Sequence, residues 1–375
     1  MKEYLLSGSI LCGDNFEVVE GYIHIRNGVI TEVCEEPGYV DARAHGIIMP
    51  CFVNAHTHIG DSVLKDPQVT DLTSLVQPPD GLKHRVLRTT SMRDLVQAMR
   101  ASTYDMAATG TCAFADFREG GLCGVQALQQ AASSAPVDAV IFGRPTGSNS
   151  GDQVYGSDNT DRSCATDLED EIGSILSCAD GIGISSTSDY EDGVSAAIAE
   201  CTTKYGGRFA IHAGELNSTD IMDALALTPD LLIHLTHASN DDLRRVADHD
   251  IPVVVCLQSN LLTRVGVPPV EAMFAENMTV AAGTDNVMFN SVDMFAEMRF
   301  LSSVFALSEQ QVLGMCTRSG ALALGLNCGT IKTGADAKVM VLDKDSYNLM
   351  GARNILRSVV RRARAGDVLF CSGGA

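Results

Sequence analysis

The sequence predicts an α/β protein, a (β/α)8 barrel of the TIM type with a small β-sandwich subdomain formed from both termini. Two observations predict this fold. In the middle of the chain, apolar strand-like runs alternate with helix-like stretches, which is typical of βα units around a parallel sheet. The two ends of the chain show alternating strand patterns instead. We therefore expect residues 1–47 and 329–375 to form the β subdomain and residues 48–328 to form the barrel.

The N-terminal segment shows the pattern of a β-hairpin. In "GYIHIRNGVITEV", Ile23 and Ile25 alternate with polar residues, and Asn27-Gly28 is a strong signal for a two-residue turn between strands. The C-terminal stretches "GTIKTGADAKVMVLDKD" and "GDVLFCSGG" have similar strand character. We expect the two ends to pair with each other outside the barrel.

The middle of the chain contains a set of apolar runs with the length of buried strands. They are "IIMPCFVNAH", "TCAFADF", "VDAVIFGRP", "GIGISS", "GRFAIHAGE", "LLIHLTH", "PVVVCLQSN" and "TVAAGTDN". Helix starts lie between them, because Ser239 with Asp242, and Ser308 with Gln311, have the spacing of a capping box. Eight such units fit a (β/α)8 barrel.

The composition restricts the classes of partner. A formal net charge of −20 argues against binding to nucleic acids or anionic membranes, which are themselves negative. No run of about 18 apolar residues and no signal peptide is apparent, so we expect a cytoplasmic protein. The 12 cysteines form no CxxC pair, which favours reduced, mostly buried thiols.

Polar residues that can bind metals close several of the predicted strands. They are His56 and His58, His212 and Glu215, His234 and His237, and Asp285. The carboxyl ends of barrel strands meet at one rim, where active sites lie. An HxH pair alone is equally typical of a hydrogen-bonded core pair. With a third imidazole and a carboxylate at the same rim, we predict a Zn²⁺ or Fe²⁺ site held by His56, His58, His212 and Asp285, with a position open for water.

This motif set resembles the amidohydrolase superfamily of metal-dependent hydrolases. HxH after the first strand, "HAGE", a sixth-strand histidine and "GTDN" are most similar to its cytosine deaminase, guanine deaminase and chlorohydrolase branch. Some members hold two metals bridged by a lysine that ends strand four, but "ADGIGISSTSDY" contains no lysine. The resemblance thus implies one divalent metal per chain, zinc or iron(II).

The resemblance also implies the catalytic roles. Asp285 would accept the proton of the attacking water, and Glu215 would carry protons to a ring nitrogen and to the departing ammonia. The alternative role for Glu215 is that of an acid in the first turn of a helix. His234 would steady the attacking oxygen, with His237 as the alternative because the two lie three residues apart.

Substrate-binding residues are less clearly indicated. Arg118 and Arg144 follow the second and third strands and could hold an anionic or carbonyl part of a substrate, or simply tie loops to acidic neighbours. Asn260 and His237 are further candidates. Adenosine-type deaminases of this branch carry a tryptophan- and glutamate-containing motif where this chain has "DLTSLVQPPDGLKHRVL", and the chain contains no tryptophan. The pattern therefore indicates the metal chemistry but no particular substrate.

We expect a deaminase that releases ammonia from a purine- or pyrimidine-like heterocycle, a small-molecule substrate. Hydrolysis of a cyclic amide, as in imidazolone hydrolysis, and a non-catalytic binding protein on the same scaffold are the alternatives. Members of the superfamily often form oligomers, so a homo-oligomer is one possible state of this chain. The polar segment 146–172 is either a lid over the site or disordered.

Overall fold

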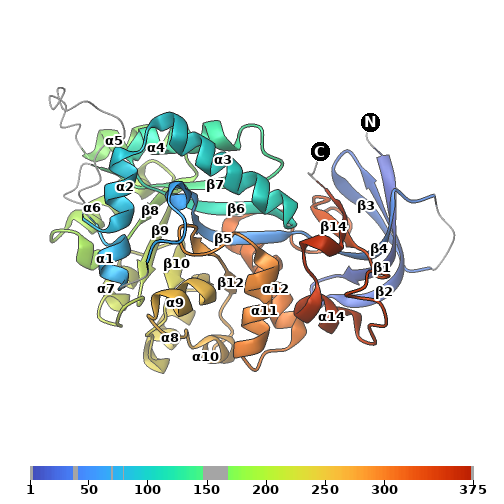
Figure 1. Ribbon diagram of the computed structural model, residues 1–375. Helices are drawn as coiled ribbons and strands as arrows, with labels where there is room; N and C mark the ends of the chain where they lie inside the picture. Colours follow the sequence, from blue (N-terminus) through green and yellow to red (C-terminus); the bar gives the residue numbers. More distant parts are fainter. Residues whose placement is uncertain (1–2, 37–40, 69–70, 79, 147–167, 373–375) are drawn as a thin grey trace.

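The computed structural model describes residues 3–36, 41–68, 71–78, 80–146 and 168–372. A curled parallel sheet surrounded by helices lies beside a separate β sheet that carries both ends of the chain (Figure 1). The predicted fold class, a TIM-type barrel with a separate β subdomain from both termini, is confirmed, and the strands of the expected β-sandwich form one hydrogen-bonded sheet. The expected lid at 146–172 falls mainly on residues 147–167, which lie outside the described residues.

The β subdomain is one six-stranded sheet with the order β15-β14-β4-β1-β2-β3. Its strands are β1 (Glu3–Cys12), β2 (Glu17–Arg26), β3 (Val29–Cys34), β4 (Ala44–Pro50), β14 (Val339–Leu342) and β15 (Val368–Cys371). The hairpin between β2 and β3 turns at Asn27 and Gly28, whose φ values of 52° and 81° belong to a turn with two left-handed residues. An aliphatic core that includes Ile23, Ile25 and Ile48 packs against this sheet.

The barrel sheet is parallel and closes on itself. Its strands are β5 (Phe52–His58), β6 (Thr111–Arg118), β7 (Asp138–Gly143), β8 (Gly181–Ile184), β9 (Arg208–Ala213), β10 (Leu231–His234), β11 (Val253–Val255), β12 (Val280–Ala282) and β13 (Asp285–Asn286). β12 pairs with β11, whereas β13 pairs with β5 through Asp285 and Thr57. Between them, a Cβ at Gly283 would lie 2.8 Å from the backbone of His56. Only glycine therefore lets the last strand approach the first.

Helices follow the barrel strands and extend into the C-terminal segment. They are α1 (Leu72–Val76), α2 (Leu82–Thr89), α3 (Met92–Ala108), α4 (Gly121–Ala132), α5 (Leu168–Leu176), α6 (Val194–Lys204), α7 (Ile221–Ala226), α8 (Asn240–Ala247), α9 (Leu257–Thr263), α10 (Val270–Ala275), α11 (Met294–Val304), α12 (Glu309–Cys316), α13 (Arg318–Leu324) and α14 (Ile355–Arg362). The predicted capping boxes at Ser239 and Ser308 are confirmed at the starts of α8 and α12. None of the described helices combines the length and apolar character needed to span a membrane.

Two apolar runs differ from the expected single strands. The run "IIMPCFVNAH" forms β4 and β5 in two different sheets, because the chain passes at Cys51 from the β subdomain into the barrel. β4 thus ends at Pro50, three residues beyond the expected boundary at 47. The run "PVVVCLQSN" ends as a strand at Val255, and its last residues begin α9. Apolar runs of this length do not reveal where a strand stops.

Candidate metal centre and active site

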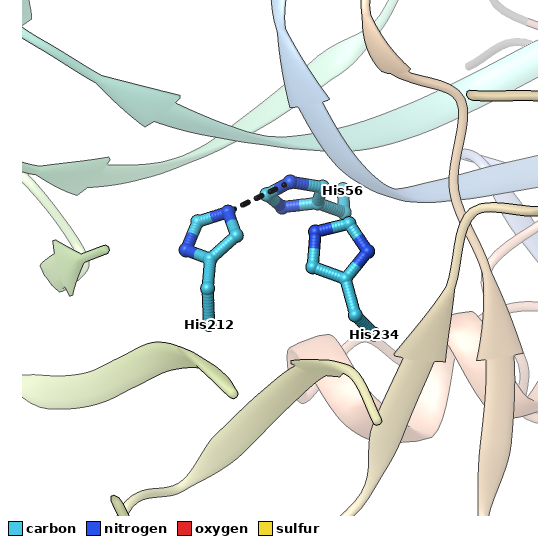
Figure 2. A group of neighbouring side chains, drawn as sticks. All are labelled: His56, His212 and His234. Atoms are coloured by element: carbon cyan, nitrogen blue, oxygen red, sulfur yellow. Dashed lines mark hydrogen bonds between the residues drawn. The ribbon is translucent and has the colours of Figure 1, made fainter. Parts of the chain in front are cut away.

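The four predicted metal ligands and the predicted catalytic His234 lie together at the rim where the barrel strands end. His56 and His58 end β5, His212 lies on β9, His234 ends β10 and Asp285 begins β13. All five are buried. Figure 2 shows the imidazoles of His56, His212 and His234 facing a common space from three different segments.

The potential ligand atoms of these side chains lie close to one another. The Nε2 atoms of His56 and His58 lie 3.3 and 3.7 Å from Oδ1 of Asp285. The Nε2 atoms of His212 and His56 lie 3.3 Å apart. Ligand atoms of His56, His58 and Asp285 all lie within 4.8 Å of one another, and so do those of His56, His212 and His234.

Backbone carbonyls fix the orientation of the His58 and His212 rings. Nδ1 of His58 donates to the carbonyl of Phe117 at 3.0 Å, and Nδ1 of His212 donates to the carbonyl of Ile184 at 2.8 Å. Since a carbonyl can only accept, each Nδ1 carries the proton, and the lone pair of Nε2 faces the cluster. Neutral imidazoles held in this way are typical metal ligands. The donors therefore fit a divalent cation.

The charges of the cluster agree with this fit. Burial lowers the pKa of His56, lowers that of His58 to about 3, and holds that of His212 well below its usual value. Burial by itself opposes ionisation of Asp285, but the hydrogen bond and charge of His56, with the other histidines, keep its pKa well below the usual range. The cluster is thus three neutral imidazoles around a carboxylate, as metal binding requires.

The backbone is strained at two of these positions. His234 and Asp285 have φ values of 78° and 60°, and Leu235 has 51°. Left-handed residues other than glycine cost about 1–3 kcal/mol each when the surroundings impose them. The tertiary structure thus holds His234 and Asp285 in conformations that the local sequence disfavours.

Glu215 lies beside the cluster on the cavity side. Its Oε1 is 3.6 Å from Nε2 of His234, and ligand atoms of Glu215, His234 and Asp285 lie within 4.8 Å of one another. Burial raises the pKa of Glu215, although the nearby His234 opposes this shift. A carboxyl group with a raised pKa can give and take a proton near neutral pH.

Asp285 is held by groups that the sequence did not single out. Ser259 donates from Oγ to Oδ2 at 2.6 Å, and Asn286 donates from Nδ2 to Oδ1 at 2.8 Å. Ser259 lies on α9, and the first backbone N–H of that helix, at Leu257, donates to the buried Glu297 at 2.8 Å. The only sequence signal for Ser259 was its place beside Asn260 in "QSN".

A cavity opens from the cluster. It is bounded by the α1–α2 segment, the ends of β7 to β10 and the residues after them: His58, Leu72, Thr73, Val76, Gln77, Pro78, Lys83, Arg144, Ser185, Ser186, Ser188, Asp189, His212, Glu215, Leu216, Asn217, Thr219, Asp220, His234, Asp285 and Asn286. In Figure 1, α1 and α2 lie at the end of the barrel away from the β subdomain. The cavity and the β subdomain are therefore at opposite ends of the barrel.

The structure separates the four substrate-binding candidates. Arg144 lines the cavity, whereas Arg118, His237 and Asn260 are not among its lining residues. The fully buried Arg118 pairs with Glu119 and lies 3.5 Å from Asp116.

The other two candidates are engaged with neighbouring groups. His237 donates from Nε2 to the carbonyl of Val265 at 2.8 Å, and Asn260 donates from Nδ2 to Thr236 at 2.8 Å. The structure thus brings His234, rather than His237, beside Glu215.

Lys83 and Glu119 form a buried ion pair behind His58 that the sequence analysis missed. Glu119 contacts the ammonium of Lys83, and its Oε1 lies 3.1 Å from Nδ1 of His58. Lys83 is only 4% exposed. No sequence signal identified it, because lysines are rarely buried.

The chain is similar to known proteins over nearly its whole length. The model of the amidohydrolase family matches residues 47–373. An uncharacterised protein of Methanocaldococcus jannaschii is 32% identical over 387 residues, which cover 97% of this chain and 96% of that protein. A 5-methylthioadenosine/S-adenosylhomocysteine deaminase of Thermococcus sibiricus is 24% identical, covering 98% of this chain and 92% of that protein. The zinc-bound structure of an adenosine deaminase from Xanthomonas campestris has the same fold, with a TM-score of 0.81 at 18% identity, covering 98% of this chain and 91% of that chain.

Proposed function

This chain belongs to the amidohydrolase family, and we propose that it is a deaminase that hydrolyses an exocyclic amino group of a purine- or pyrimidine-like heterocycle and releases ammonia. The family and its hydrolytic relatives make it a hydrolase of carbon–nitrogen bonds. The observation that carries the finer proposal is Glu215 beside His234 at the mouth of the histidine–aspartate cluster. An acid beside a metal site suits the hydrolysis of an amino group, because the departing ammonia needs a proton donor.

The metal would be held by His56, His58, His212 and Asp285, and we propose one zinc or iron(II) ion per chain. A divalent ion there would lower the pKa of a water molecule and so supply a nucleophile at neutral pH. Asp285, whose pKa the neighbouring histidines hold well below its usual value, would accept the proton of the attacking water.

Glu215 and His234 act on the substrate side. Glu215, whose pKa burial raises, protonates a ring nitrogen and then the amino group as it leaves. His234 donates a hydrogen bond to the oxygen on the attacked carbon, where negative charge develops. The roles are separated by environment, because the surroundings hold the pKa of Asp285 well below its usual value and raise that of Glu215.

The test is an ammonia-release assay on protein loaded with Zn²⁺ and, separately, with Fe²⁺. The substrates are amino-purines, amino-pyrimidines, pterins and their nucleosides. We expect release of ammonia that falls about 10²- to 10⁴-fold in Glu215→Gln, with metal content unchanged. Metal-loaded protein that releases no ammonia from any of these compounds, or that opens a cyclic amide instead, would contradict the proposal.

A further inference from the structure

Lys83 is a cation in a place that local electrostatics disfavour. It lies in the first turn of α2, where the helix dipole is positive, and it is only 4% exposed. Burying an ammonium is costly unless it is paired and hydrogen-bonded. Its side chain nevertheless borders the cavity.

Lys83 has two acceptors among the described residues. One is the carboxylate of Glu119, and the other is Oδ1 of Asn286 at 3.5 Å. An ammonium group offers three N–H donors. Because Lys83 lines the cavity, a third donor is available to a group that enters it.

Asn286 fixes this ammonium relative to the reacting end of the cavity. Its Oδ1 lies beside Lys83, and its Nδ2 donates to Asp285 at 2.8 Å. Lys83 is thus separated from a proposed metal ligand by a single side chain. A substrate atom bound to Lys83 would therefore lie close to the histidine–aspartate cluster.

Two acidic residues of the cavity lining accept hydrogen bonds from neighbouring protein groups. Asp220 accepts hydrogen bonds from the backbone of Gly214 at 2.8 Å and from Ser186 at 2.6 Å, and Asp189 accepts one from Gln77 at 3.3 Å. The basic residues of the wall, Lys83 and Arg144, carry donors only. The ammonium of Lys83, with two protein acceptors, thus has an N–H left for an acceptor on the ligand.

We propose that Lys83 binds an oxygen acceptor of the substrate, so that the substrate is an aminated heterocycle bearing an oxo or carboxylate group. This inference rests on the proposed function, whose substrate class it narrows. Lys83 then determines specificity, whereas the attack itself depends on the metal cluster and Glu215. Heterocycles without such an oxygen leave the ammonium of Lys83 without its third partner.

The test compares ligands that differ only in the oxygen. The probes are 4-aminopyrimidine, cytosine and 5-carboxycytosine, together with 2-aminopurine and guanine. Dissociation constants are measured by calorimetry on zinc-loaded Glu215→Gln protein, and KM and kcat on zinc-loaded protein with Glu215 intact. We expect Lys83→Met to raise the Kd and KM of the oxygen-bearing members about 10- to 100-fold, while the oxygen-free members change by less than about twofold.

Three further variants separate binding from folding. Lys83→Arg keeps the charge and should keep the preference for oxygen. Lys83→Met combined with Glu119→Gln removes both buried charges, so that a folding defect from an unpaired carboxylate is avoided. Lys332→Met, on the exposed surface of the β subdomain, is the matched control and should behave as the unmodified protein does.

The outcomes distinguish this inference from the proposed function. Equal weakening of all ligands in Lys83→Met, or no weakening, would overturn the inference. Failure to release ammonia from any of these probes and from any of the pterins and nucleosides named above would refute the deaminase proposal, and the binding comparison would still decide the role of Lys83. The increase in Kd that Lys83→Met causes is compared between cytosine and 5-carboxycytosine. This comparison shows whether Lys83 binds the oxo or the carboxylate oxygen.

Discussion

The two ends of strand β5 carry two different clusters of potential metal ligands. At its carboxyl end, His56 and His58 meet His212, His234 and Asp285. At its amino end, four thiols that we call the basal thiols meet between the barrel and the β subdomain: Cys51, Cys112, Cys328 and Cys371. Cys51 and Cys371 have their sulfur atoms 3.4 Å apart, and Cys112 contacts both Cys51 and Cys328.

The two clusters differ in how closely their potential ligand atoms approach one another. Ligand atoms of the histidine cluster meet in groups of three within 4.8 Å, whereas the basal thiols form no such group in the described parts of the chain. His58 and His212 have acceptors behind their rings that direct a lone pair inward. The basal thiols also differ among themselves: burial, with the neighbouring Cys112 and Cys371, raises the pKa of Cys51 well above its usual value, whereas hydrogen bonds with Cys328 and Cys51 hold the pKa of Cys112 well below it. Residue type and burial alone therefore do not make a metal site.

The largest effect is expected when one ligand is removed from the histidine cluster. His212→Ala removes one imidazole, and we expect metal content to fall to background and ammonia release to fall at least about 1,000-fold, because the water is no longer acidified. Metal per chain is measured by mass spectrometry of the purified protein. His249→Ala is the control, because this exposed histidine lies outside the cluster and its ring donates from Nδ1 to the carbonyl of Arg245. Full metal content in His212→Ala would contradict the assignment.

The next effect concerns the buried acid behind the cluster. Burial raises the pKa of Glu297 to about 7, so the folded protein keeps a proton that the unfolded chain releases near its ordinary pKa. The contribution of Glu297 to stability is therefore fully present below about pH 4.5 and falls by about 3 kcal/mol as the pH rises to about 7.

Glu297→Gln should remove this part of the pH dependence. Urea unfolding of both proteins between pH 5 and 8 measures it, and the unmodified protein should lose stability relative to the variant as pH rises. Parallel curves would show that the folded-state pKa of Glu297 is not raised.

A smaller effect is expected from the support of Asp285. Ser259→Ala removes the 2.6 Å hydrogen bond to Oδ2, and we expect a loss of about 10- to 100-fold in metal affinity, as for other groups that orient metal ligands. Competition with a chelator gives the affinity. Ser303→Ala, on the exposed face of α11, serves for comparison, and an equal affinity in the two variants would exclude an orienting role.

The smallest effect is expected at the basal thiols. Cys51→Ala leaves a small cavity, and we expect a loss of about 1–2 kcal/mol in unfolding free energy, with metal content and ammonia release unchanged. If the unmodified protein held a second metal that this variant lost, the contrast between the two clusters would be wrong.

The site residues divide by how strongly the sequence indicates them. His56, His58, His212 and Asp285 could be proposed because each closes an apolar run, and barrel topology brings such ends together. Arg118 and Arg144 occupy equivalent positions in sequence, yet only Arg144 lines the cavity while Arg118 pairs with Glu119. A position at the end of a strand predicts that a residue lies at the rim of the barrel. It does not predict whether a long side chain points into the cavity.

Other features required the folded structure. The chain passes from one sheet to the other at Cys51 within a single apolar run, which periodicity cannot divide. Lys83 and Ser259 act through contacts with Glu119 and Asp285 that lie far from them in sequence. Such contacts leave no local pattern in the chain.

The sequence by itself determined the alternation of strands and helices, the hairpin at Asn27-Gly28 and the residues at the strand ends, because these depend on local periodicity and turn chemistry. Only the tertiary structure decided that His234 lies beside Glu215, that backbone carbonyls orient His58 and His212, and that Lys83 borders the cavity. These features depend on distances between segments far apart in the chain, and packing of the whole barrel sets those distances.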